Sequence, residues 1–87
     1  MEQSQPLIIA TWDFGREANQ AGWEILARGG TALDAVEAAA RAIENNPEIT
    51  SVGYGGYPNE MGVVQLDAAI IDGMTGRMGA VAALEGI

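Results

Sequence analysis

The sequence predicts an α+β fold that combines two consecutive helices with a mostly antiparallel sheet. Three observations support this prediction: a continuous apolar run near the start, two adjacent stretches with apolar residues at helical spacing, and two apolar stretches joined by a glycine-containing turn. The predicted order is strand, helix, helix, loop, strand, strand. Such an order can form two layers, with both helices on one face of the sheet.

The first predicted element is a short buried strand over residues 7–12, Leu-Ile-Ile-Ala-Thr-Trp. Its apolar run is continuous rather than alternating, which is typical of a strand covered on both faces. Asp13 and Gly15 then interrupt the run, so we expect the strand to end there.

The second predicted element is a helix over residues 16–28, which Gly29 and Gly30 end with a left-handed cap. Its small and apolar side chains recur at helical spacing. They are Ala18, Ala21, Gly22, Ile25 and Leu26. A glycine inside a helix costs about 1 kcal/mol relative to alanine. We therefore expect Gly22 to lie at a close contact with another helix or with the sheet.

A second helix is predicted to begin at Thr31 and to end at Asn45-Asn46-Pro47. Thr31 and Asp34 have the spacing of a capping box, in which a hydroxyl satisfies one amide and a carboxylate reaches back to another. The apolar stripe of this helix consists of Leu33, Val36, Ala40 and Ile43. The remaining positions are mostly alanine, so the helix can lie close to its neighbours.

A glycine-rich loop follows, with Gly53, Gly55, Gly56 and Gly62 within ten positions. Glycine permits a positive φ or the close approach of another segment, so we expect this loop to pack against a specific neighbour. Residues 63–72 are then predicted to form a strand. Residues 73–76 form a turn and residues 78–84 a further strand, which together indicate a β-hairpin.

Both faces of this hairpin are apolar. Val64, Leu66, Ala68 and Ile70 alternate with Val63, Ala69 and Ile71. If the helices cover one face, the other stays exposed, and an exposed apolar face of this size usually marks an interface. We therefore expect a second chain or a C-terminal half of the same protein to cover it.

The composition excludes several kinds of chemistry. The chain has no histidine and no cysteine, so serine–histidine and cysteine–histidine catalysis, disulfides and thiolate metal sites are absent. The glycine loop lacks the later glycine and lysine of a phosphate-binding loop. We expect no cofactor and no metal site among these side chains.

The charge and the first residues bear on partners and location. A net charge of −8, with four arginines and no lysine, disfavours nucleic acid and anionic membranes as partners. The longest apolar runs fall short of the ~20 residues of a membrane helix. The N-terminus lacks the basic and apolar regions of a secretory signal. These features predict a cytoplasmic protein, and a leader removed from a precursor would leave no trace here.

The acidic residues are interpreted mainly as structural. We expect Asp34 to cap a helix, Glu37 to be solvated and Asp72 to form a turn, because Asp-Gly is a strong turn signal. Asp67 lies inside a strand, so we expect it to have a hydrogen-bonding or ionic partner, for which Arg77 and Arg41 are available.

Four sequence blocks carry a resemblance to a known family. They are Thr11-Trp12-Asp13-Phe14-Gly15, the stretch from Gly29 to Glu37, Ser51-Val52-Gly53-Tyr54-Gly55-Gly56, and Leu66-Asp67-Ala68-Ala69-Ile70-Ile71-Asp72-Gly73. In this order and spacing, the chain resembles the glycosylasparaginases, amidases of the N-terminal nucleophile hydrolase superfamily. The resemblance extends from about Ile8 to Ile87. It implies part of an αββα sandwich, incomplete in this chain, with residues 1–87 as the N-terminal segment of a single amidase domain within the α subunit.

The resemblance also implies a reaction. Members of this family cut themselves before a threonine, whose hydroxyl becomes the nucleophile and whose amino group serves as the base. They hydrolyse the side-chain amide of asparagine, bare or carrying N-acetylglucosamine. The threonines of this chain, Thr11, Thr31, Thr50 and Thr75, match non-nucleophilic positions. We therefore expect no catalytic residue here, a β subunit or C-terminal half that carries the nucleophile, and no activity of this chain alone. Two such αβ units are expected to pair.

Trp12 and Phe14 are the substrate-binding residues that the resemblance implies, because tryptophan at this position lines the substrate pocket. The pattern alone favours two ordinary core aromatics. Two other functions stay open. One is an isoaspartyl peptidase/L-asparaginase of the same superfamily, although the peptidases compared lack this tryptophan. In those peptidases a loop like residues 48–58 holds a monovalent cation with backbone carbonyls. The other is a small non-catalytic domain that binds or dimerises through its bare sheet face.

Overall fold

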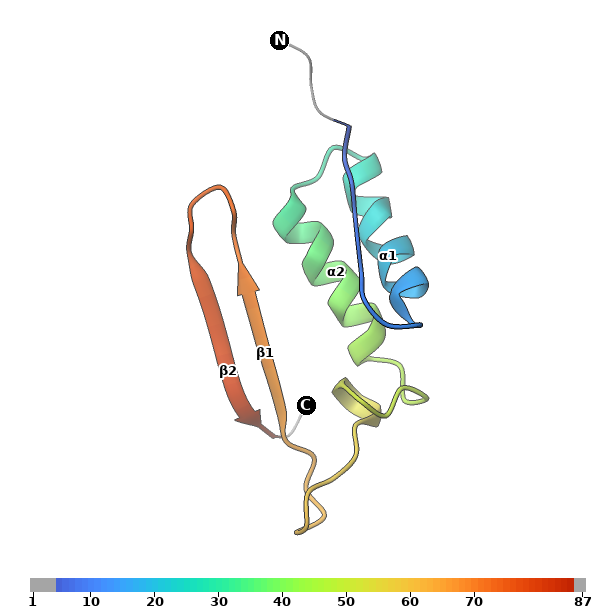
Figure 1. Cartoon of the computed structure of the whole chain (residues 1–87), viewed down its shortest axis with the longest axis vertical. Coiled ribbons are helices and arrows are strands. Elements are labelled where there is room, and N and C mark those ends of the chain that lie inside the picture. The colour runs from blue at the N-terminus through green and yellow to red at the C-terminus, as the bar shows by residue number, and fades with distance from the viewer. Residues whose placement is uncertain (1–4, 86–87) are drawn as a thin grey trace. The chain divides into compact units, whose positions relative to one another are not determined.

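Two α-helices are followed by a two-stranded antiparallel sheet, which agrees with the predicted order from the first helix onward (Figure 1). The computed structural model describes residues 5–85. The helices are α1 (Gly15–Ala27) and α2 (Ala32–Glu44), and a short 3-10 turn, η1, spans Gly53–Gly55. The strands are β1 (Leu66–Ile71) and β2 (Met78–Leu84). The α+β prediction is therefore confirmed. The chain divides into two units between Ala42 and Ile43.

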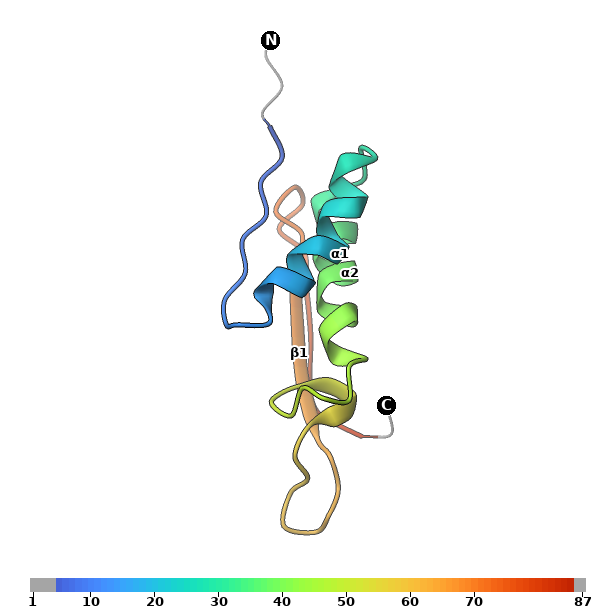
Figure 2. The ribbon, with the colours of Figure 1, turned by 90° about the vertical axis from the view of Figure 1, so that its right-hand side faces the viewer.

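In the first unit, α1 and α2 lie side by side, as Figure 2 shows. The prediction that Gly22 marks a close contact is confirmed, and the contact is with the other helix. A Cβ atom added at Gly22 would lie 3.0 Å from the carbonyl oxygen of Ala35 and 3.4 Å from the Cβ of Ala39. A side chain at this position would push α1 away from α2, since protein interiors leave little free volume.

The ends of both helices follow their predicted capping residues. Gly29 has φ +80. Its N–H donates to Leu26 O at 3.0 Å, and the N–H of Gly30 donates to Ile25 O at 2.9 Å, which is the Schellman arrangement. At the start of α2, Thr31 Oγ1 accepts a hydrogen bond from the N–H of Asp34 at 3.1 Å. This contact is one half of the predicted capping box.

The predicted strand over residues 7–12 is wrong. This segment has no regular secondary structure, and Leu7 and Ile9 are 86% and 89% exposed. A strand exists only when another strand pairs with its N–H and C=O groups, and the only strands among residues 5–85 are β1 and β2, which pair with each other. Ile8 nevertheless keeps an apolar contact, because its side chain lies against Gly22 of α1.

The second unit contains the predicted hairpin. β1 is shorter than the predicted strand over 63–72, whereas β2 agrees with residues 78–84. The two strands are antiparallel, and Ile71 pairs with Met78 next to the turn. These two side chains are 62% and 69% exposed. Within the described chain the hairpin therefore exposes apolar side chains, as the sequence predicts. Neither helix in residues 5–85 is long and apolar enough to cross a membrane.

Candidate functional site

The turn that joins the N-terminal segment to α1 holds Trp12 in an unusual conformation. Trp12 has φ +69, in the left-handed region that residues other than glycine seldom adopt. Its carbonyl oxygen accepts a hydrogen bond from the N–H of Gly15 at 3.2 Å, and its side chain is 79% exposed. A large aromatic side chain is thus presented at the surface by a strained turn. Such strain persists only where the surrounding structure holds it in place.

Phe14 lies in the same turn but in a different environment. It is the N-cap residue of α1, with φ −80 and ψ 0, and its side chain is half-buried. Its carbonyl oxygen accepts the N–H of Ala18 at 3.2 Å. The structure therefore places both predicted site residues within one turn, Trp12 largely exposed and Phe14 partly covered.

Gly15 is the residue that lets this turn close. A Cβ atom at Gly15 would lie 3.0 Å from the Cβ of Ala10, so a side chain there would press on the N-terminal segment. Gly15 is also buried and donates the hydrogen bond to Trp12. This role of Gly15 could not be predicted from the sequence, because it depends on a hydrogen bond and on the proximity of Ala10.

The glycine loop packs against the end of α2, as the density of glycines predicts. Gly53 has φ +66, and a Cβ atom there would collide with the backbone of Glu44, the last residue of α2. A Cβ atom at Gly55 would meet the carbonyl oxygens of Pro47 and Ile49. These two glycines are therefore required by close backbone contacts, which gives the loop a structural reason for its composition.

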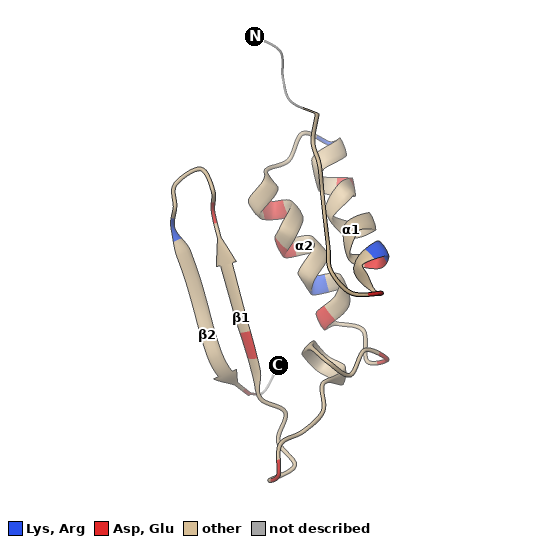
Figure 3. Cartoon of the chain, in the orientation of Figure 1, with Lys and Arg blue, Asp and Glu red and all other residues tan. Residues whose placement is uncertain are grey.

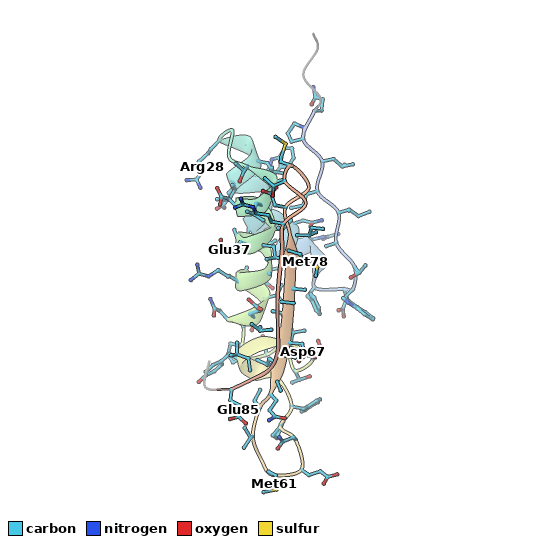
Figure 4. All side chains as sticks on the ribbon, turned by 90° about the vertical axis from the view of Figure 1, so that its left-hand side faces the viewer. Arg28, Glu37, Met61, Asp67, Met78 and Glu85 are labelled. Atoms are coloured by element: carbon cyan, nitrogen blue, oxygen red, sulfur yellow. The ribbon has the colours of Figure 1, made fainter. Side chains whose placement is uncertain are left out.

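The acidic residues of α2 are structural. Glu37, labelled in Figure 4, accepts a hydrogen bond from Arg41 one turn later, with 3.3 Å between Oε1 and Nη1. Both side chains are exposed, so this ion pair contributes little to stability. Asp34 lies in the first turn of α2, where a negative charge is favoured by the helix dipole.

Asp72 shapes the hairpin turn, as predicted. Its Oδ1 accepts the N–H of Met74 at 3.1 Å, and its Oδ2 accepts the hydroxyl of Thr75 at 3.2 Å. The residue in the left-handed region is Gly76, with φ +73. Thr75 Oγ1 in turn accepts the N–H of Arg77 at 3.2 Å. Both the carboxylate of Asp72 and the hydroxyl of Thr75 are therefore engaged in the turn.

Asp67 has the hydrogen-bonding partner that its position predicts, but the partner is neither arginine. Its Oδ1 accepts the backbone N–H of Ala83 across the hairpin at 2.8 Å. Figure 4 shows Asp67 on β1. The side chain is exposed rather than buried, so the backbone amide rather than a second charge satisfies it.

The charged side chains do not gather into a reactive cluster. Figure 3 shows acidic and basic residues spread along both helices, the loops and the hairpin. Within residues 5–85, no three acidic side chains converge in a way that would hold a metal ion.

Comparisons with known proteins assign this sequence to a family. The sequence profile of a family described as asparaginase matches residues 5–87. The chain is 46% identical over 84 residues to an N(4)-(β-N-acetylglucosaminyl)-L-asparaginase of Elizabethkingia miricola. The matched region covers 97% of this chain and 24% of that protein. It is 44% identical over 82 residues to the rat (Rattus norvegicus) protein of that name, covering 94% of this chain and 24% of the rat protein.

A relative with a different name matches nearly as much of the sequence. The chain is 39% identical over 79 residues to "Probable isoaspartyl peptidase/L-asparaginase 3" of Arabidopsis thaliana, covering 91% of this chain and 22% of that protein. This chain spans about a quarter of the length of the curated relatives it matches. The match to the family profile extends over nearly all of the sequence, and the chain therefore belongs to the asparaginase family.

Proposed function

We propose that this chain is the N-terminal part of an amidohydrolase that cleaves the side-chain amide of asparagine carrying N-acetylglucosamine. The names of the relatives from Elizabethkingia miricola and rat support this substrate. The proposal assigns the two helices and the hairpin to one part of an αββα sandwich. It assigns the threonine nucleophile to a β subunit or C-terminal half that these 87 residues do not contain.

The observation that carries the proposal is the conformation of Trp12. Trp12 has φ +69, a conformation that costs backbone strain, and its indole is 79% exposed in the part of the chain that the structure describes. A ligand-binding role requires an aromatic face that is held rigidly, and the hydrogen bond from Gly15 helps to hold this turn.

The part that Trp12 plays in this proposal is to bind and orient the substrate. The indole presents a flat apolar surface against which the carbon skeleton of the substrate packs. The N–H of its ring can donate to a substrate oxygen. Phe14, half-buried beside it, supports the shape of the same wall. Neither side chain can act as a nucleophile or a base, so the bond cleavage itself belongs to the second polypeptide.

Intact-mass spectrometry of every polypeptide in the purified sample is the first test. We expect hydrolysis of N-acetylglucosaminyl-asparagine only in a sample that holds a second chain beginning with threonine. The pure 87-residue chain should release no product. Turnover by that single chain, with no second polypeptide in the mass spectrum, would overturn the proposed division of labour.

A substitution of Trp12 tests the site itself in the active two-chain enzyme. An aromatic contact contributes about 0.5–1.5 kcal/mol beyond its buried area. Trp12→Ala should therefore lower kcat/KM by about two- to tenfold from this contact, since ~1.4 kcal/mol corresponds to a factor of ten. Trp23→Ala is the matched control, because Trp23 is a half-exposed tryptophan on α1 outside the turn. Equal losses in the two variants would refute a binding role for Trp12.

The match to the Arabidopsis relative supports a second candidate, an isoaspartyl peptidase/L-asparaginase. The two candidates differ in the substrate that the complete enzyme prefers. Faster hydrolysis of N-acetylglucosaminyl-asparagine than of free asparagine or a β-aspartyl peptide supports the first. The reverse order supports the second.

A further inference from the structure

The hairpin contains an irregularity that the turn does not explain. From Ile71 opposite Met78 to Ala68 opposite Val81, the strands follow one continuous register. The next pair is Leu66 opposite Leu84, so the register shifts between Leu66 and Ala68. Two residues of β2 therefore lie opposite Asp67, which is the arrangement of a β-bulge.

Asp67 and Ala83 make the contact that holds this bulge. Ala83 has φ +53, a conformation that is unfavourable for alanine. The extra residue of a bulge is also left unpaired, which locally disrupts the ladder of hydrogen bonds. The carboxylate of Asp67 reaches across the strands and accepts the N–H of Ala83 at 2.8 Å. The side chain of one strand thus supplies an acceptor for a backbone N–H of the other strand.

The bulge decides which side chains share a face of the hairpin. Side chains alternate between the faces of a strand, and residues that pair directly lie on the same face. With the bulge, Leu84 shares the face of Leu66, Ile70 and Val81. A regular continuation of the register would pair Leu66 with Ala83 and turn Leu84 to the opposite face, because a one-residue slip exchanges the faces.

We propose that Asp67 is a register lock, a positioning residue that selects the bulged hairpin and thereby gathers Leu66, Ile70, Val81 and Leu84 on one face. The turn around Asp72 sets the register at one end, where the N–H of Asp72 donates to Arg77 O at 2.9 Å. Asp67 resets the register at the other end. Beyond the bulge, Gln65 Nε2 donates to Glu85 Oε1 at 3.0 Å, which continues the shifted register.

Nuclear magnetic resonance of the complete protein, with this chain isotope-labelled, tests this proposal through cross-strand contacts. The native chain should show contacts between Leu66 and Leu84. Asp67→Ala should replace them with contacts between Leu66 and Ala83, and the amide of residue 83 should exchange about fivefold faster or more, the effect of one ordinary hydrogen bond. Asp67→Asn is the matched control, since its amide oxygen can still accept the same hydrogen bond.

The double variant Asp67→Ala/Ala83→Gly keeps the proposal falsifiable if the single variant loses the hairpin. Glycine adopts a positive φ without strain, so this variant should regain the contacts between Leu66 and Leu84. Unchanged contacts in Asp67→Ala would overturn the proposal. So would loss of the hairpin without recovery in the double variant, or absence of the contacts between Leu66 and Leu84 in the native chain.

Discussion

Alanine substitutions in the glycine loop separate backbone strain from steric contact, because the loop offers one glycine for each case. Gly62 has φ +79 with no atom within 4 Å of an added Cβ, so alanine there meets only strain. Gly55 has no positive φ, but an added Cβ would meet the carbonyl groups of Pro47 and Ile49. Gly53 combines both effects, with φ +66 and an added Cβ 2.7 Å from the carbonyl carbon of Glu44.

The expected magnitudes follow from these two terms. A left-handed alanine costs about 1–2 kcal/mol, and replacing glycine returns about 0.4–1 kcal/mol by restricting the unfolded chain. Gly62→Ala should therefore destabilise the loop by roughly 1 kcal/mol. An overpacked contact costs about 1–3 kcal/mol. The atoms that an added Cβ would meet at Gly53 and Gly55 belong to the backbone, which moves aside less easily than a side chain does. Gly53→Ala should then cost roughly 2–4 kcal/mol.

Amide hydrogen exchange measures the local opening of this loop directly. The reporting amide is Tyr57, whose N–H donates to Thr50 O at 3.1 Å. We expect Gly53→Ala and Gly55→Ala to bring its exchange rate close to that of an unprotected amide, whereas Gly62→Ala should accelerate it roughly tenfold or less, since ~1.4 kcal/mol is a factor of ten. Equal rates in Gly53→Ala and Gly62→Ala would refute the contact with Glu44 as the reason for glycine.

Two further substitutions test the helices by far-ultraviolet circular dichroism. Gly22→Ala should lower helicity, because the added Cβ would lie 3.0 Å from the carbonyl oxygen of Ala35. Alanine is by itself the better helix former by about 1 kcal/mol. A gain in helicity would therefore contradict the contact between the two helices. Thr31→Ala should destabilise α2 by about 1 kcal/mol, since it removes the acceptor of the Asp34 N–H. Thr31→Ser should retain the cap, and equal effects of the two substitutions would contradict it.

The helices could be predicted because their signals are local. The apolar spacing, the left-handed Gly29 and the hydroxyl of Thr31 act within one or two turns of the chain, and each is found where the sequence places it. The hairpin could be predicted for the same reason, since Asp72 and Gly76 form its turn over a few residues. These elements could therefore be predicted from residues that lie close together in the sequence.

The features that could not be predicted from the sequence depend on contacts between distant residues. An apolar run such as residues 7–12 indicates that a segment favours burial. A strand also needs a partner strand, and the apolar pattern does not show whether one is present. The bulge at Ala83 could not be predicted from the sequence either, because the acceptor of the Ala83 N–H is the side chain of Asp67, sixteen residues away. The positive φ of Trp12 has no compositional signal at all, since glycine is the residue that ordinarily marks such positions.

The candidate site follows the same division. Trp12 and Phe14 could be located by the resemblance of their block to a family, and the structure adds that one is exposed and the other half-buried. The role of Gly15 needed the structure, because it depends on a hydrogen bond and on the proximity of Ala10.

The small buried core leads to a last prediction, on how the isolated chain unfolds. The buried hydrophobic side chains among residues 5–85 are Ala18, Ala35 and Ile43, two of which are single methyl groups. Burial of apolar surface contributes only about 25 cal/mol per Å², and a two-stranded hairpin is marginal by itself. A broad, non-cooperative thermal transition is therefore expected for the 87-residue chain. A sharp transition of a monomer, identical by near- and far-ultraviolet circular dichroism, would contradict this reasoning. That result would favour the alternative of a free-standing binding domain over a segment of a larger amidase.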